Sequence, residues 1–269
     1  MIRIAFSTIA CPAYTPLEMA NAARRYGYDG VELYALEGKR LTPDQLAPRL
    51  DEFRRAFVDL PIVSINSWGQ LSSPDPDERY AQEAQIARTV ELASALDCHL
   101  VKTFGGDLPP DRAPTEVFDY MAVHIQRLAK RAEALGVTLV IETHDGFSCS
   151  AHVAALLARV DTPGFGALWD VHHPYRMGES VANTDRTIGG RVAHAHVKDA
   201  VREGEGWRYV PLGTGELPVR EMIASLAARG FDGYLSVDAE KMWHAEVDEP
   251  EIGLPQYAAV LREYIDAAS

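Results

Sequence analysis

The chain is poor in cysteine and in long apolar runs, and each shortage excludes a class of protein. Only three cysteines occur among 269 residues, Cys11, Cys98 and Cys149, with neither a pairing pattern nor CxxC spacing. We therefore expect no disulfide framework and no thiolate metal site, and thiols of this kind fit a reducing cytoplasm. No apolar run approaches the roughly 20 residues that span a bilayer, so no membrane contact is expected. The first residues also lack a basic leader followed by an apolar region, so no export signal is expected.

Basic residues are also scarce, because 26 lysines and arginines face 39 acidic residues and give a formal net charge of -13. Such a chain repels phosphate backbones unless it carries a local basic patch. Its tightest basic pairs are residues 24–25, 54–55 and 130–131, all in helical segments, and we interpret them as solvated helix faces. Nucleic acid is therefore not an expected partner. No GxGxxG follows the first β-rich run, so a dinucleotide-binding fold is not expected either.

The chain does contain a regular alternation of β-rich runs and longer amphipathic stretches. Eight runs predict strands over 2–8, 30–34, 62–66, 99–104, 137–143, 166–171, 191–198 and 233–240. Helices are predicted between them, for example over 15–27, 78–97 and 115–136, and Gly27, Gly136 and Gly230 each end a helix just before a strand. Strand–helix alternation implies a parallel sheet with right-handed crossovers. Eight units in this length predict a single (β/α)8 TIM barrel over residues 1–269, with no linker dividing it.

Acidic and imidazole side chains end four successive predicted strands. Glu142 ends the fifth, Asp170 the sixth, His196 lies near the end of the seventh, and Asp238 and Glu240 follow on the eighth. In this fold the active site forms at the carboxyl ends of the strands. Several acids close together repel one another unless a cation lies among them. The pattern therefore predicts one divalent metal ion, with manganese, magnesium or cobalt favoured by oxygen-rich ligation and zinc or iron as alternatives.

Simpler roles compete for each of these residues taken alone. A strand-end acid often caps the next helix or pairs with a neighbouring base, and His172 or His173 could cap or pack. His194 shares a strand face with His196 but is expected in a deeper barrel layer, as a hydrogen-bonded core histidine. Glu32, at the end of the second strand, bonds either a substrate hydroxyl or a neighbouring basic residue.

Five segments, in order, resemble the xylose isomerase-like sugar (phosphate) isomerase/epimerase barrels. They read GVTLVIETHDGFS, GALWDVHHPYR, RVAHAHVKDA, PLGTGELP and GFDGYLSVDAEKMWH. Each motif alone is weak, but the resemblance runs through all eight units and is most specific from residue 137 to 244. It implies a xylose isomerase-like TIM barrel that acts on a carbohydrate or related polyol.

The resemblance also implies roles for individual residues. Glu142 and Asp238 match the family's acids that bind metal and transfer protons, and Asp170 and His196 match its middle ligands. One departure concerns the eighth strand, where the family usually has Glu and this chain has Asp238, a side chain shorter by roughly 1.5 Å. Glu240 is therefore kept as the alternative fourth ligand.

Further residues are candidates for substrate contact. The resemblance implies that His173 contacts substrate, and that Arg202 does so less securely because loop lengths vary. Lys198 is a candidate to polarise substrate oxygens, and Trp68 and Trp243 to stack on a sugar ring, although rim packing explains these tryptophans equally well. The GTGEL turn at 213–217 could bind an anion through its amides, or simply lead into the next helix.

We expect a metal-dependent isomerase or epimerase in which Glu142 and Asp238 (or Glu240) approach opposite faces of a carbon next to a carbonyl, through an enediolate. A dehydratase or lyase of the same fold, of inosose, dehydroshikimate or C-glycoside-cleaving type, is the main alternative. A non-catalytic sugar- or partner-binding barrel is a second alternative. An endonuclease IV-like nuclease is disfavoured, because the third and fourth strands lack the histidines that its metal cluster needs. Large apolar loop residues, Trp207 and Trp243, would suit a dimer interface that closes the site.

Overall fold

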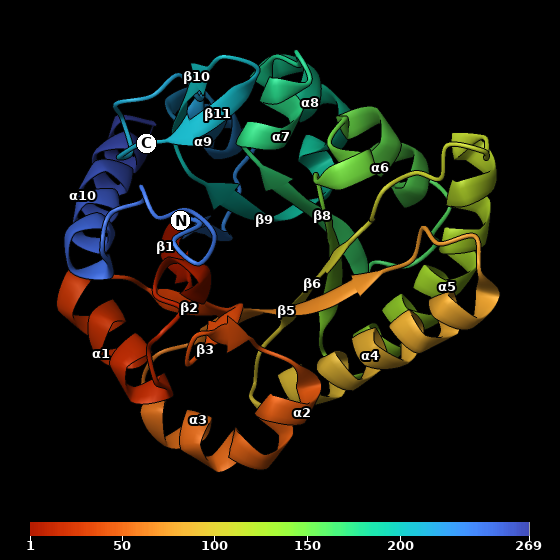
Figure 1. The fold of residues 1–269 in the computed structure, drawn as a ribbon, viewed down its shortest axis with the longest axis horizontal. Helices are drawn as coiled ribbons and strands as arrows, with labels where there is room; N and C mark the ends of the chain where they lie inside the picture. Colours follow the sequence, from red (N-terminus) through yellow and green to blue (C-terminus); the bar gives the residue numbers. More distant parts are fainter. Residues whose placement is uncertain (269) are drawn as a thin grey trace.

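Eight buried strands alternate along the chain with the helices that cover them. The computed structural model describes residues 1–268. The barrel strands are β1 (Arg3–Ser7), β2 (Gly30–Leu33), β5 (Ile62–Gln70), β6 (Leu100–Phe104), β7 (Thr138–Glu142), β8 (Phe165–Asp170), β9 (Val192–Val197) and β12 (Tyr234–Val237). They close into one barrel in the order β1-β12-β9-β8-β7-β6-β5-β2, every pair parallel (Figure 1). The predicted TIM barrel is therefore confirmed.

An outer ring of helices surrounds the barrel (Figure 1). The helices are α1 (Pro16–Tyr26), α2 (Pro43–Leu46), α3 (Leu50–Ala56), α4 (Pro76–Ala95), α5 (Pro114–Ala134), α6 (Ser150–Leu157), α7 (His172–Arg176), α8 (Val181–Ile188), α9 (Val219–Ala228) and α10 (Pro250–Ala268). Short 3-10 turns occupy η1 (Thr8–Ala10), η2 (Ala47–Arg49), η3 (Asp145–Phe147) and η4 (Gly189–Arg191). Local signals set these bounds, as α1 shows: Thr15 and Glu18 form a capping box, and Gly27 ends the helix with a φ of 75°.

Two small hairpins interrupt the strand–helix alternation, and neither was expected from the sequence. The strands β3 (Ala35–Leu36) and β4 (Lys39–Arg40) form one hairpin directly after β2. The strands β10 (Ala200–Glu203) and β11 (Gly206–Tyr209) form the other directly after β9. Both follow the carboxyl ends of barrel strands, so they add side chains to the barrel mouth.

Two strand ends differ from the sequence-based prediction by three residues or more. The strand β5 continues past residue 66 to Gln70, because its pairing with β6 shifts between Asn66 and Gln70. Within that shift Trp68 adopts a φ of 59°, a conformation that costs a non-glycine residue about 1–2 kcal/mol. The strand β12 ends at Val237 rather than at residue 240, so Asp238 lies just beyond it.

The described residues also test the expectations that came from composition. The three cysteines are free thiols, as expected. The basic pairs of α1, α3 and α5 are exposed, which agrees with solvated helix faces. None of the helices in residues 1–268 combines the length and apolar character needed to cross a bilayer.

Candidate metal centre

Four neighbouring barrel strands bring three carboxylates and one imidazole to a single point. Glu142 ends β7, Asp170 ends β8, His196 lies near the end of β9, and Asp238 directly follows β12. Asp170 is level with His196 in the β8–β9 pairing, which places both side chains at the same height in the barrel. One ligand atom from each of the four residues lies within 4.8 Å of the others, and all four are at least 96% buried.

Two buried lysines accompany this four-residue cluster. Lys102, from β6, places its Nζ 2.6 Å from Glu142 Oε2. Lys198, just after β9, lies 3.1 Å from Asp170 Oδ2 and 3.2 Å from Asp238 Oδ2. Both lysines are 1% exposed. The prediction placed Lys198 at the site but missed Lys102, although a lysine inside a buried strand signals a buried counter-charge.

The charges at the cluster shift one another's pKa values. Burial alone would raise the pKa of Glu142, but Lys102 and His196 outweigh it and hold this pKa below its usual value. Burial raises the pKa of Asp170, and although Lys198 opposes this shift, burial together with repulsion from Glu142 keeps this pKa above its usual value. Burial favours a neutral His196, yet the carboxylates around it raise its pKa well above the usual value. The three carboxylates thus attract positive charge, and they favour the protonated form of His196.

The donor set fits a divalent cation. Two atoms bound to one ion at about 2.0–2.2 Å can lie at most roughly 4.4 Å apart, so the cluster needs only small side-chain shifts to close on an ion. Within residues 1–268, Asp238 Oδ1 is buried and accepts no hydrogen bond, whereas Asp170 Oδ2 has only the Lys198 ammonium, 3.1 Å away. Buried carboxylate oxygens without a donor are costly, and a cation would satisfy them.

Asp238 and Glu240 occupy different positions relative to the cluster. The Asp238 carboxylate lies within the group of four. Glu240 accepts hydrogen bonds from Lys198 Nζ at 2.7 Å and from the Tyr209 hydroxyl at 2.8 Å. Burial opposes ionisation of Glu240, but Lys198 and Tyr209 lower its pKa to about 2. Glu240 is therefore held beside the group rather than within it.

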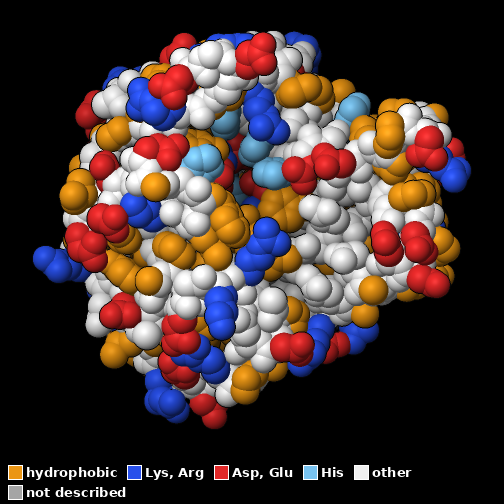
Figure 2. Space-filling model, viewed as in Figure 1, with side chains coloured by type: hydrophobic (Ala, Val, Ile, Leu, Met, Phe, Trp, Pro, Cys, Tyr) orange, Lys and Arg blue, Asp and Glu red, His pale blue; other side chains and the backbone are white. Residues whose placement is uncertain are grey.

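A cavity of about 400 Å³ opens over the cluster and is lined by Glu142 and Asp238, among others. Figure 2 shows histidine and acidic side chains gathered around a hollow near the centre of this face. Trp68 and Trp243 line the same cavity. Between them lies Arg40, from the β3–β4 hairpin, with its guanidinium 4.4 Å from the Trp68 ring and 5.2 Å from the Trp243 ring. Sequence reasoning missed Arg40 because nothing in its neighbourhood marks that hairpin.

The other predicted substrate contacts lie at different distances from the cluster. His173, in α7, is buried beside Asp170, with 3.8 Å between His173 Nε2 and Asp170 Oδ1. Burial and the nearby Lys198 hold the pKa of His173 well below its usual value, so its ring is neutral. Arg202, by contrast, is exposed on the β10–β11 hairpin, where its guanidinium lies over the Trp207 ring. The structure therefore brings His173 to the site but not Arg202.

The amides of the GTGEL turn bind an anion that belongs to the chain itself. Asp199, directly after Lys198, accepts hydrogen bonds from the backbone N–H groups of Gly213, Gly215 and Leu217 at 2.8–3.2 Å. A Cβ at position 215 would lie 2.2 Å from Asp199 Oδ1, so only glycine permits this approach. The turn is thus held against the β10–β11 hairpin, and its amides are not free for a substrate phosphate.

Comparison with known proteins matches this chain to a family of TIM barrels. The profile of the family described as "Xylose isomerase-like TIM barrel" matches residues 20–264. Fructoselysine 3-epimerase of Shigella flexneri is 24% identical over 92% of this chain and 94% of its own. Inosose dehydratase of Bacillus licheniformis is 28% identical over 53% of this chain and 51% of its own. The solved structure of the IOLI protein with a binding zinc atom superposes with a TM-score of 0.83, covering 99% of both chains at 15% identity.

Proposed function

Because the chain belongs to the xylose isomerase-like TIM barrel family, we propose that it is a divalent-metal-dependent isomerase or epimerase of a sugar or sugar-like polyol. The observation that carries this proposal is the cluster of Glu142, Asp170, His196 and Asp238 beneath an open cavity. Three carboxylates and one imidazole suit a manganese, magnesium or cobalt ion, with zinc as an alternative. Similarity to a fructoselysine 3-epimerase along nearly the whole chain supports a reaction of this class.

The bound metal would polarise a substrate carbonyl and stabilise the negative charge of an enediolate. Glu142 and Asp238, on strands separated by β8 and β9, would face the reacting carbon from two sides, one removing its proton and the other returning it. Lys102 keeps Glu142 ionised, which is the form that accepts a proton. Glu240 accepts hydrogen bonds from Lys198 and Tyr209 and lies outside the group of four, which supports Asp238 as the fourth ligand.

The remaining contacts of the proposed site surround the cavity. Lys198 and the neutral His173 lie beside Asp170, from where they would hold substrate oxygens. Trp68 and Trp243 would stack against the apolar face of the substrate at the cavity mouth. Arg202 is left out of this proposal because it is exposed on the β10–β11 hairpin.

Proton exchange with solvent tests the proposal most directly. The metal-loaded protein would be incubated in D₂O with a panel of ketoses, ketose–amine adducts and inososes, and deuterium at the carbon next to the carbonyl would be followed by NMR. We expect wild-type protein to exchange and epimerise one class of substrate. Glu142→Gln should abolish exchange while leaving the fold intact, whereas the surface control Glu91→Gln should retain full activity. Exchange that survives in Glu142→Gln would refute the role of this glutamate.

A dehydratase is the second candidate, supported by the similarity of half the chain to an inosose dehydratase. Enolate formation is common to both reactions, and only the fate of the neighbouring hydroxyl differs. Mass spectrometry of the product separates them, because dehydration yields a product lighter by one water. A binding protein without catalysis would show neither exchange nor dehydration. The binding-protein alternative would be favoured if the protein were purified without metal and its Tm did not change on addition of metal or EDTA.

A further inference from the structure

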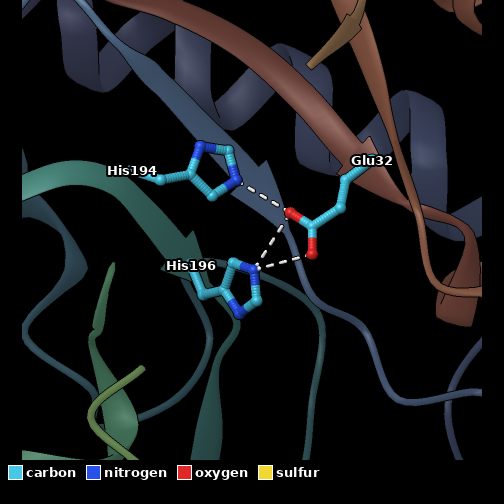
Figure 3. A group of neighbouring side chains, drawn as sticks. All are labelled: Glu32, His194 and His196. Atoms are coloured by element: carbon cyan, nitrogen blue, oxygen red, sulfur yellow. Dashed lines mark hydrogen bonds and ion pairs between the residues drawn. The ribbon is translucent and has the colours of Figure 1, made fainter. Parts of the chain in front are cut away.

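A further buried carboxylate, Glu32, lies next to the four-residue cluster and takes no part in the chemistry described so far. Glu32 is the penultimate residue of β2 and is fully buried in the barrel interior. Figure 3 shows its carboxylate facing the imidazoles of His194 and His196, both of which come from β9. The strands β2 and β9 are not paired with each other, because β1 and β12 lie between them in the barrel. The contact is therefore made across the barrel by side chains alone.

The hydrogen bonds of Glu32 fix the ring of His196 in one orientation. His196 Nε2 lies 3.1 Å from each of the two Glu32 oxygens. His194 Nε2 lies 2.8 Å from Glu32 Oε2. An ionised carboxylate can only accept hydrogen bonds, so both Nε2 atoms carry the hydrogen. The other nitrogen of His196, Nδ1, faces the cluster, where it lies 2.9 Å from Glu142 Oε1 and 3.7 Å from Asp238 Oδ2. By the same rule Nδ1 donates a hydrogen bond to the ionised Glu142, and a bound metal would take the place of that hydrogen.

This arrangement matches the way proteins support metal-binding histidines. A ligating imidazole usually donates its second N–H to a carboxylate, which sets the tautomer and the ring orientation, and loss of that partner typically costs about 10–100-fold in metal affinity. The desolvation of a fully buried carboxylate is expensive unless hydrogen bonds compensate it. Glu32 accepts its hydrogen bonds from the two imidazoles. One of these imidazoles, that of His196, supplies the single nitrogen ligand of the cluster.

We propose that Glu32 is a positioning residue that holds His196 as the Nε2–H tautomer, with Nδ1 directed at the metal. This inference rests on the proposed metal centre. His194 serves as a deeper support that shares Glu32 Oε2 and does not face the cluster. The sequence distance of 162 residues between Glu32 and His194 means that the three side chains meet only in the closed barrel.

Cobalt binding to Glu32→Gln tests the proposal without any substrate. An amide offers one acceptor oxygen and one donor NH₂, so it cannot accept at both positions that Glu32 now fills. We expect the Kd for Co²⁺ to rise about 10–100-fold, and the visible d–d spectrum of bound Co²⁺ to change because the imidazole is no longer held. The matched control is Glu91→Gln, the same chemical change at an exposed position of α4, which should bind Co²⁺ with unchanged affinity and spectrum.

The outcomes separate this inference from the proposed function. Wild-type protein that binds no Co²⁺ would refute both. Wild-type protein that binds Co²⁺ while Glu32→Gln binds it equally well, with the same spectrum and only a lower Tm, would show a purely structural role and refute this inference alone. Two metal ions per chain, one of them lost in His194→Gln, would make the Glu32 trio a metal site in its own right and also overturn the proposal.

Nitrogen-15 NMR of histidine-labelled wild-type protein provides a test that does not depend on a variant. With Zn²⁺ bound, His196 should show a hydrogen on Nε2 and none on Nδ1, with its signals assigned by their loss in His196→Gln. A His196 ring protonated at Nδ1 in the metal-bound protein would refute the proposed tautomer, whatever the stability of Glu32→Gln.

Discussion

Replacing Lys102 with methionine tests whether its ammonium group offsets the negative charge of the carboxylate cluster when no metal is bound. Methionine is similar in length but carries no ammonium group, so Glu142 loses the cation 2.6 Å from its Oε2. Removing one partner of a buried ion pair typically costs about 3–5 kcal/mol, because the other charge stays buried and unpaired. For a chain of this size, each kcal/mol lowers Tm by roughly 2–4 °C. In EDTA, the Tm of Lys102→Met should therefore fall by at least about 6 °C.

A bound divalent metal should reverse much of this loss. The ion would supply positive charge next to Glu142, so the variant should bind Mn²⁺ more tightly than wild-type protein does. Because a ligand that binds only the folded state stabilises it in proportion to its affinity, the rise in Tm on adding Mn²⁺ should be larger in Lys102→Met than in wild type.

Differential scanning fluorimetry with EDTA and with a Mn²⁺ titration measures both effects. The control is Lys130→Met, which removes an exposed lysine on α5 and should leave both Tm values unchanged. An equal fall in Tm with and without Mn²⁺ would refute the reasoning, because it would mean that Lys102 and the metal do not act on the same charge. An unchanged Tm in EDTA would refute the buried ion pair itself.

Two further predictions concern the ligand set and a network outside the site. Asp238→Ala should lose bound metal when the purified protein is analysed by elemental mass spectrometry, whereas Glu240→Ala should retain about one ion per chain; the reverse pattern would make Glu240 the ligand. Glu83, on α4, lies 2.6 Å from His124 Nδ1 and 2.6 Å from the Arg127 guanidinium, both on α5. Although burial opposes ionisation, these partners hold the pKa of Glu83 below its usual value. Its contribution of about 1–3 kcal/mol should therefore be present near neutral pH and disappear as the pH falls below about 4.5. Urea unfolding of Glu83→Gln and wild type at several pH values measures it, and a stability difference that does not shrink in acid would contradict this assignment.

The barrel and the approximate place of the site follow from local features of the chain. Eight β-rich runs alternate with amphipathic stretches, and glycines such as Gly27 end helices with a positive φ. Parallel strands in a closed barrel all present their carboxyl ends on one rim. The meeting of Glu142, Asp170 and His196 can therefore be predicted without any knowledge of tertiary contacts, because each residue lies at or near the end of its own strand.

The partners of those residues depend on contacts that no local pattern encodes. Glu32 reaches His196 across the barrel interior, and Lys102 reaches Glu142 from the adjacent strand by the length of its side chain. The choice between Asp238 and Glu240 depends on the position of Lys198, which holds Glu240 beside the cluster. The β3–β4 hairpin was also unexpected, because its turn places a glutamate rather than Asn or Asp at a positive φ.

The amino-acid sequence by itself therefore specifies which helices and strands form and which side chains lie at their ends, because periodicity, capping and turn chemistry act over a few residues. Only the closed barrel decides how those side chains pair. Buried charges and hydrogen bonds are satisfied by whichever groups the packed interior brings within about 3 Å. In this protein those groups come from strands up to 164 residues apart in the chain.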